Sequence, residues 1–247
     1  MQCPTVPARE PSRVDSHHAR LSGWVRSLRA AWGGGIRTVR HLVARVVVIR
    51  RVFFFETDLT QTLRTATARI PLEIRPAAAA DIEAFAEDLK AAGLSADDAR
   101  RRLEGGEVPI IAVSAGRLTH MHWLVFAGPV LLGELGLTLH LGPGDVFNSY
   151  AVTLPGWRGK GIHPSVSTFI NRYERSRGYT RDLFYVWAHN AANLRVVVGK
   201  LRRRRTKTLW CVWLFGRRRP WSFGCKGHGV PRLERATASR TSGTSIE

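Results

Sequence analysis

The feature that most constrains this chain is a glycine loop between a strand-like segment and a helix-like segment. The segment 146–153 is rich in β-branched and aromatic residues and stops just before Pro155, as a strand does. The loop itself contains Arg158-Gly159-Lys160-Gly161. After it, one apolar stripe has helical spacing and ends before Gly178: Val166, Phe169, Ile170 and Tyr173. The pattern predicts a strand, a tight turn and a helix, in that order.

Two properties of this loop favour an anionic ligand. Gly159 and Gly161 let the backbone take left-handed angles and approach a ligand closely. The amides that open the next helix have no intrahelical partner and carry the positive end of the helix dipole. Pro164 supports the helix start, because proline in the first turn gives up an amide that lacks a partner anyway. A diphosphate fits such a loop, and a plain basic turn is the alternative interpretation.

The same residues resemble a known family. Arg158-Gly159-Lys160-Gly161-Ile162 after a strand, with Asn190-Ala191-Ala192-Asn193 further along the chain, is similar to the GNAT superfamily of acyl-CoA-dependent N-acyltransferases. The family pattern is Arg/Gln-x-x-Gly-x-Gly/Ala. Arg158 and Gly161 match it, whereas His163 stands at the last position, where its side chain is expected to crowd the third amide. The resemblance extends over residues 70 to 215 and is strongest from 150 to 200.

The resemblance implies acetyl-CoA or another acyl-CoA as co-substrate and no metal. The free backbone of the strand ending at Thr153 would pair with the pantetheine arm, and amides near Ala151 would polarise the thioester carbonyl. Asn190 corresponds to a family asparagine that faces the coenzyme, whereas Asn193 either fills the family's serine position or is a plain N-cap. The implied cofactor-binding positions are Ala151, Thr153, Arg158, Gly159, Lys160, Gly161, Ile162, His163, Asn190 and Asn193.

The chain departs from the family at the acid and base positions. Val196 to Val198 occupy the region of the family's tyrosine, and the strand before the loop lacks the glutamate that many members use as a base. Proton transfer is therefore predicted to fall to one of four residues, with the tyrosine first: Tyr150, His120, His122 and Glu134. His120 and His122 alternate along a strand and share one face, where each is either a cleft residue or a core histidine.

The resemblance implies an enzyme that transfers an acyl group directly from acyl-CoA to an amine of a small molecule or peptide. The alternative is a catalytically degenerate protein of the same fold that binds nucleic acid or an anionic membrane surface. A formal net charge of +19 on 247 residues keeps that alternative open, because it indicates a polyanionic partner.

Cysteine usage is typical of a reducing compartment. The three cysteines are too few and too far apart for a disulfide framework: Cys3, Cys211 and Cys225. We therefore expect a cytoplasmic protein, with peripheral association at the inner membrane face as an extension of that prediction. Cys211, Cys225 and His228 do not have the spacing of a known zinc finger, so no metal site is predicted.

Four regions are expected along the chain. Residues 1–20 are a basic tail without the apolar run of a signal peptide, and 21–69 are a basic extension with a helix and a strand. Residues 70–216 form the GNAT-like domain, and 217–247 form a second basic extension, disordered from residue 230 onward. The apolar run 42–55 is cut by three arginines, so it is predicted as a sheet strand rather than a membrane span. A segment lying on an anionic membrane surface is the alternative for this run.

The predicted fold class is α/β, with a mixed, mostly antiparallel central sheet flanked by helices. A helix is expected to open at Asp81, and a second one begins with a capping box at Ser95. Ser114 to Arg117 predict a hairpin between two strands. The expected strands are 72–76, 108–113, 118–126, 131–141, 146–153, 182–188 and 209–215, and the last helix is 193–201.

Overall fold

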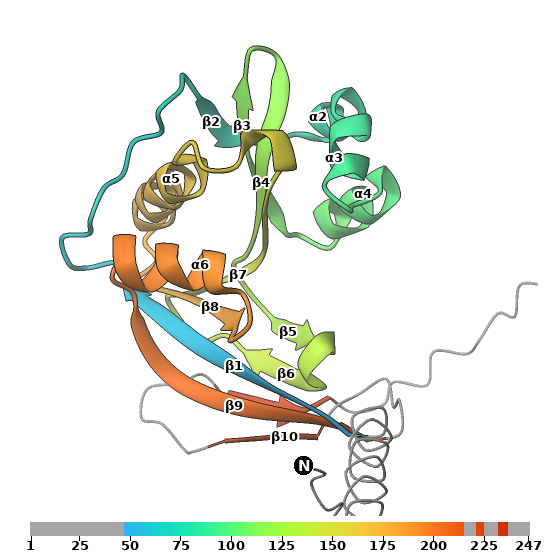
Figure 1. The fold of residues 1–247 in the computed structure, drawn as a ribbon, viewed down its shortest axis with the longest axis vertical. Helices are drawn as coiled ribbons and strands as arrows, with labels where there is room; N and C mark the ends of the chain where they lie inside the picture. The colour runs from blue at the N-terminus through green and yellow to red at the C-terminus, as the bar shows by residue number, and fades with distance from the viewer. Residues whose placement is uncertain (1–46, 215–220, 225–231, 237–247) are drawn as a thin grey trace, which may run out of the picture. The chain divides into compact units, whose positions relative to one another are not determined.

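The structure is a computed structural model that describes residues 47–214, 221–224 and 232–236 (Figure 1). The tail expected at 1–20, most of the 21–69 extension, and Cys3, Cys225 and His228 lie outside the described residues.

The described residues build an eight-stranded sheet with the order β10-β9-β1-β8-β7-β4-β3-β2. Antiparallel pairs are β10–β9, β1–β8, β7–β4, β4–β3 and β3–β2, whereas β7 and β8 run parallel. The predicted fold class is therefore confirmed. The strands are β1 (Val47–Asp58), β2 (Glu73–Pro76), β3 (Val108–Ser114), β4 (Arg117–Val125), β7 (Asp145–Thr153), β8 (Arg181–Trp187), β9 (Arg204–Leu214) and β10 (Trp221–Gly224).

Strand β1 comes from the apolar run, whose prediction as a sheet strand is confirmed. It lies between β8 and β9, and Phe53 pairs with Val186. Val52 and Phe55 are completely or almost completely buried, because the strand is covered on both faces. The sheet therefore begins upstream of the expected boundary at residue 70. Among the described residues, no helix is long and apolar enough to cross a membrane.

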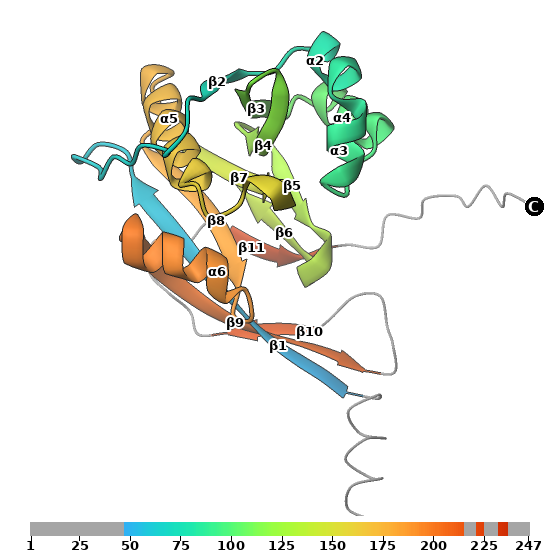
Figure 2. The same ribbon diagram turned by 45° about the horizontal axis from the view of Figure 1, so that its top comes forward.

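Helices flank the sheet on both faces. Figures 1 and 2 show α2 (Ala79–Ala84), α3 (Ala86–Ala91) and α4 (Ala96–Glu104) on one side of β3 and β4 and α5 (Ile162–Ser176) on the other. Helix α6 (Ala191–Leu194) continues as a π-helical turn, Arg195–Lys200. Each side has an apolar cluster, and residues of β4 contribute to both: Met121 and Trp123 to the α2–α4 side and Leu124 to the α5 side.

Of two predicted helix starts, one is confirmed and the other is shifted. The cap at Ser95 is confirmed, since its Oγ accepts the amide hydrogen of Asp98 at 3.0 Å. The helix expected to open at Asp81 starts instead at Ala79, because the Asp81 carboxylate accepts the Ala78 amide from the third helical position. The same helix is interrupted at Phe85, whose backbone leaves the helical region.

The run predicted as a strand over 131–141 is a hairpin. Strands β5 (Pro129–Leu132) and β6 (Leu137–His140) flank a 3₁₀ turn, and Gly136 takes a left-handed φ of 63°. Strand β11 (Arg232–Arg235) pairs with β6, so the order of this second sheet is β11-β6-β5. The expectation of disorder after residue 230 therefore does not hold for β11, which gains a partner that is distant in sequence.

Candidate functional site

Strands β7 and β8 diverge after a short stretch of pairing. Their last paired residues are Phe147 and Leu183. Beyond them, β7 stays paired with β4 and β8 stays paired with β1. A β-bulge marks the divergence, because Trp123 pairs with Tyr150 and Leu124 pairs with Asn148, which leaves Ser149 as the extra residue. Bulges bend a strand, and this one lies where the β7 edge facing β8 loses its strand partner among the described residues.

A cavity of about 320 Å³ occupies the gap between the diverging strands. Its wall combines residues of β7 and β8 with the N-terminal two thirds of α5 and with residues between Asn190 and Arg203. Both ionisable and apolar groups line it, including Asn148, Asp182, Phe184 and Tyr185.

A second cavity of about 420 Å³ lies at the glycine loop. Gly159 and Gly161 have φ values of 79° and 78°, in the left-handed region that favours glycine. Gly161 is the N-cap of α5, so the first amides of this fifteen-residue helix open toward the loop. The predicted succession of strand, turn and helix is confirmed.

The cations of the loop do not all face the cavity. Arg158 lines it and donates from Nε to the carbonyl of Thr153 at 3.1 Å, so its guanidinium is held beside the end of β7. Lys200 also lines this cavity. Lys160 instead places Nζ 4.4 Å from the centre of the Trp157 ring and is not among the lining residues.

The two cavities adjoin, because they share four lining residues: Ala151, His163, Asn190 and Asn193. The result is one recess that runs from the first amides of α5 along the unpaired edge of β7. All four residues belong to the set that the sequence predicted for cofactor binding.

Comparison with solved structures identifies the architecture. The chain is similar to a GCN5-related N-acetyltransferase from Sphaerobacter thermophilus, with a TM-score of 0.51 and 11% identity over 71% of this chain and 54% of that one. The fold is GNAT-like. GNAT-family acetyltransferases from Colwellia psychrerythraea and Novosphingobium aromaticivorans have lower TM-scores of 0.46 each, at 14% identity. They overlap 73% and 68% of this chain and 57% and 64% of their own lengths.

The chain thus spans about half to two thirds of the lengths of these proteins. No protein-family model and no curated protein sequence matches it. At these identities the likeness concerns the fold, and the site has to be judged from its own residues.

Within the GNAT-like fold, the two asparagines have different tasks. Asn190 is the N-cap of α6, and its Oδ1 accepts the amide hydrogen of Asn193 at 3.1 Å. The alternative that Asn193 is an N-cap is therefore wrong, because the helix starts two residues earlier. The Oδ1 of Asn193 is buried without a hydrogen-bond partner and lies at the junction of the two cavities.

Tyr150 and Glu134 both line the first cavity and both have partners. The Tyr150 hydroxyl donates to the carbonyl of Ala92 at 3.0 Å, and burial raises the pKa of this hydroxyl. Glu134 accepts a hydrogen bond from the indole of Trp187 at 2.9 Å. Their proposed parts in proton transfer stay predictions.

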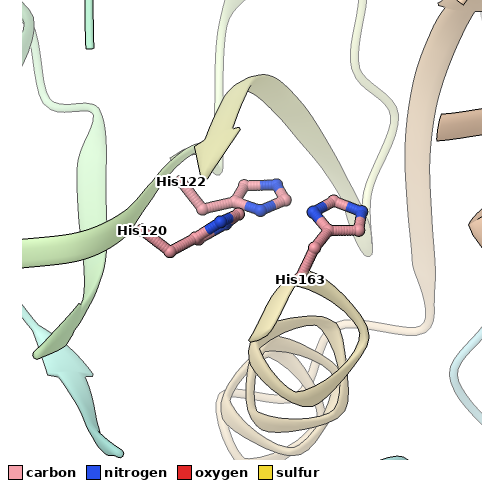
Figure 3. Close-up of side chains that lie close together, drawn as sticks. All are labelled: His120, His122 and His163. Carbon is pink, nitrogen blue, oxygen red and sulfur yellow. The ribbon is translucent and has the colours of Figure 1, made fainter. Parts of the chain in front are cut away.

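The predicted pair His120 and His122 is joined by a third imidazole, that of His163 (Figure 3). The His163 ring centre lies 5.4 Å from that of His120 and 6.2 Å from that of His122. The His163 side chain therefore points toward β4, although the sequence suggested that it crowds the loop amides. Burial, together with the neighbouring His163, lowers the pKa of His122 to about 3. Burial and the nearby Arg203 lower the pKa of His163 to about 4, so both rings are neutral at pH 7.

A buried group of charges beneath the cavity was not predicted from the sequence. Glu174 of α5 is completely buried, and neither of its carboxylate oxygens has a hydrogen-bond partner. Burial raises the pKa of Asp182 to about 6, while the Asn148 amide donates to its carboxylate. Arg203 donates to Asn171 at 3.0 Å from the same wall. Helical spacing contained a hint, because Glu174 continues the stripe of Val166 and Ile170 at intervals of four.

Proposed function

We propose that this protein transfers an acetyl or other acyl group from acyl-CoA to an amine. The observation that carries the proposal is the continuous recess, which joins an anion-binding helix start to an unpaired strand edge. The amides between Gly159 and His163 would bind the pyrophosphate, assisted by the dipole of α5. The free edge of β7 between Asn148 and Thr153 would hydrogen-bond the amides of the pantetheine arm.

In this proposal the thioester lies near the bulge at Ser149, where the recess is enclosed by both strands. The neutral amine attacks the thioester carbonyl, so that a carbon–nitrogen bond forms and the carbon–sulfur bond breaks. The electron pair leaves with the coenzyme thiolate, and the nitrogen loses one proton. Backbone amides near Ala151 would stabilise the negative charge that develops on the carbonyl oxygen.

The acceptor would enter through the first cavity. Two carboxylates lie in its wall, those of Glu134 and Asp182, and each suits a cationic amine better than an acid. These groups favour a small molecule or peptide that carries an ammonium group, which must lose a proton before attack. Of the four predicted acid or base residues, His122 has a neutral ring and lines this cavity.

The first experiment tests the cofactor. Arg158 and Lys200 line the loop cavity, and charge-assisted hydrogen bonds to phosphate contribute roughly 1.5 to 3 kcal/mol each. Replacing both by glutamine should raise the dissociation constant of acetyl-CoA at least about tenfold in isothermal titration calorimetry.

Lys160→Gln is the matched control, because it removes a cation of the same loop that stacks on Trp157 outside the cavity. An equal loss of affinity in this control would mean that general charge, and not this site, attracts the coenzyme. If the parent protein fails to bind acetyl-CoA but binds nucleic acid with a steep salt dependence, the proposal gives way to the binding alternative.

A second experiment tests turnover. The release of coenzyme thiol from acetyl-CoA should depend on an added amine when polyamines, amino sugars and peptides are supplied in turn. Product mass then shows whether the acyl group sits on nitrogen. Thiol release that is the same with and without every amine would contradict N-acyl transfer.

A further inference from the structure

The three imidazoles form the densest group of potential metal ligands among the described residues. One nitrogen from each of His120, His122 and His163 can be chosen so that all three lie within 4.8 Å of one another. The first two residues lie two apart on β4 and share a face, while the third comes from the first turn of α5 (Figure 3).

We propose that His120, His122 and His163 bind a divalent transition-metal ion, with Zn²⁺ the best match. The proposal concerns a site beside the acyl-transfer recess and stands whether or not the protein transfers acyl groups.

The orientation of His120 supports ligation. Its Nδ1 lies 2.8 Å from the hydroxyl oxygen of Thr153, which fixes the ring and leaves Nε2 directed away from that contact. That Nε2 is buried and has no hydrogen-bond partner. Metal-binding histidines commonly use one nitrogen for the ion and the other for such an orienting hydrogen bond.

The burial of His122 supports ligation independently. The residue is only 5% exposed, and both of its ring nitrogens lack a hydrogen-bond partner. The amide nitrogen of the neighbouring Asn148 donates to the carboxylate of Asp182. Buried polar atoms without partners are rare in proteins, and a metal ion would satisfy one of these nitrogens directly.

The distances require only a local adjustment. Metal–nitrogen bonds of about 2.0–2.1 Å at tetrahedral angles place the ligand nitrogens about 3.4 Å apart. The three nitrogens therefore have to close by an ångström or so, which rotation of the imidazoles about their side-chain bonds can supply. The backbone of β4 is held between β3 and β7, so the two strand ligands come from a fixed frame.

The ligand chemistry selects the class of ion. Three imidazoles without a carboxylate suit zinc, copper, nickel or iron and do not suit Ca²⁺ or Mg²⁺, which prefer oxygen. Three histidines also leave a tetrahedral ion one open position. His122 and His163 both line the first cavity, so that position would face the recess.

The test uses the full chain and metal content as the readout. Protein purified without a metal-binding tag should contain about one equivalent of zinc by mass spectrometry. After removal of metal with a chelator, Co²⁺ should bind with the visible absorption of a tetrahedral site, and Zn²⁺ should displace it. His163→Ala should weaken Zn²⁺ binding by about a hundredfold or more, as should His122→Ala.

His189→Ala is the matched control, because this histidine stacks on Trp187 outside the cluster. Thr153→Val keeps all three ligands but removes the orienting contact of His120, and should weaken binding by about 10–100-fold. If His122→Ala does not fold, His163 and Thr153 decide the matter, since both are only partly buried.

The proposal is overturned if the parent chain binds no Zn²⁺ or Co²⁺. It is also overturned if binding survives unchanged in His163→Ala, or if His189→Ala loses as much affinity as the cluster variants.

Discussion

The two faces of strand β4 are equally buried, but they differ in how many of their buried polar atoms have a hydrogen-bond partner. Toward α2–α4, Met121 and Trp123 are buried beside carboxylates that are paired, such as Asp88 with Arg117 at 2.6 Å. Toward α5, His120 and His122 are equally buried and leave ring nitrogens without partners. On the α4 side, the atoms without a hydrogen-bond partner belong to Trp123 and Arg102, which stack on each other at 5.3 Å.

This difference separates stability from function. On the α2–α4 side most buried polar groups have partners within the protein, so this face has little to gain from a ligand. A face that keeps buried nitrogens and carboxylate oxygens unpaired is less stable than it need be, and such exceptions concentrate where a ligand or proton is handled. Substitutions on the two faces should therefore have different effects.

The largest effect is expected at Gly161, on the α5 side. Its φ of 78° strains any other residue, and an added Cβ would lie 3.4 Å from the carbonyl oxygen of Thr67. Gly161→Val should weaken acetyl-CoA binding by about two orders of magnitude, because two or more amide contacts of roughly 1.5 to 3 kcal/mol are lost.

Gly159→Ala is the control for Gly161, since it has the same backbone strain and its Cβ would meet nothing within 4 Å. Thermal unfolding of both variants measures the cost of the strained backbone, and calorimetry measures the loss of acetyl-CoA affinity. Equal binding by parent and Gly161→Val would remove the loop from the site.

Glu174, on the α5 side, should make the stability of the protein depend on pH. Burial, followed by the neighbouring Asp182 carboxylate, raises the pKa of Glu174 well above its ordinary value of 4.5. At a pH between the pKa of Glu174 in the unfolded chain and its higher pKa in the folded protein, the folded state binds more protons. The free energy of unfolding therefore falls as pH rises through this range. Each tenfold difference in proton affinity corresponds to about 1.4 kcal/mol.

Glu174→Gln removes this dependence. The variant should be more stable than the parent at about pH 8, and the difference should shrink toward about pH 4, as measured by urea unfolding. A gap that stays constant with pH would show that Glu174 does not titrate in this way.

Asp88, on the α2–α4 side, should have the opposite effect on stability as pH changes. The hydrogen bond from Arg117 lowers the pKa of Asp88 below 3.8, so its stabilisation is complete above that pH and is lost as pH falls. Its carboxylate also accepts the buried amide of Leu118 at 3.1 Å.

Asp88→Ala should therefore cost about 1–3 kcal/mol at neutral pH and less in acid, with acetyl-CoA affinity unchanged. Most of this cost concerns the Leu118 contact, because Arg117 is largely exposed and its ion pair is screened. A change in coenzyme affinity would contradict the division between the faces.

The smallest effect is expected for Tyr150→Phe. The hydroxyl bonds the carbonyl of Ala92, so its removal should cost about 0.5–1.5 kcal/mol of stability and leave the rate of acyl transfer within a few fold. Steady-state kinetics with an accepted amine test this. A rate loss of about a hundredfold, typical of an acid or base, would support the predicted role of Tyr150 in proton transfer.

The features that were predicted correctly from the sequence are those that depend on residues close together along the chain. The glycine loop, the Ser95 cap and the β3–β4 hairpin are local patterns, and the structure has each of them. His120 and His122 were correctly placed on one face, because alternation along a strand is local. His163 joins them only when α5 packs on β4, and no spacing in the sequence encodes that contact.

The buried carboxylates escaped prediction for a related reason. Composition places Glu174 and Asp182 on the surface, where most charged residues lie. Their burial follows from the tertiary packing of α5 and β8, which places Asp182 in the wall of the first cavity and Glu174 near Asp182. The break at Phe85 and the turn at Gly133–Leu135 likewise depend on how short elements meet the sheet.

The position of β1 between β8 and β9 has a consequence for synthesis of the chain. Phe53 and Phe55 leave the ribosome well before Val186 and Phe184, the residues opposite them in the sheet. At about 5–20 residues per second, this strand waits on the order of ten seconds for its first partner. During that time its backbone edge can pair with another nascent chain. A chain that begins at residue 70 avoids this wait but leaves β8 with an open apolar edge, so its yield as monomer should be limited by aggregation rather than by folding.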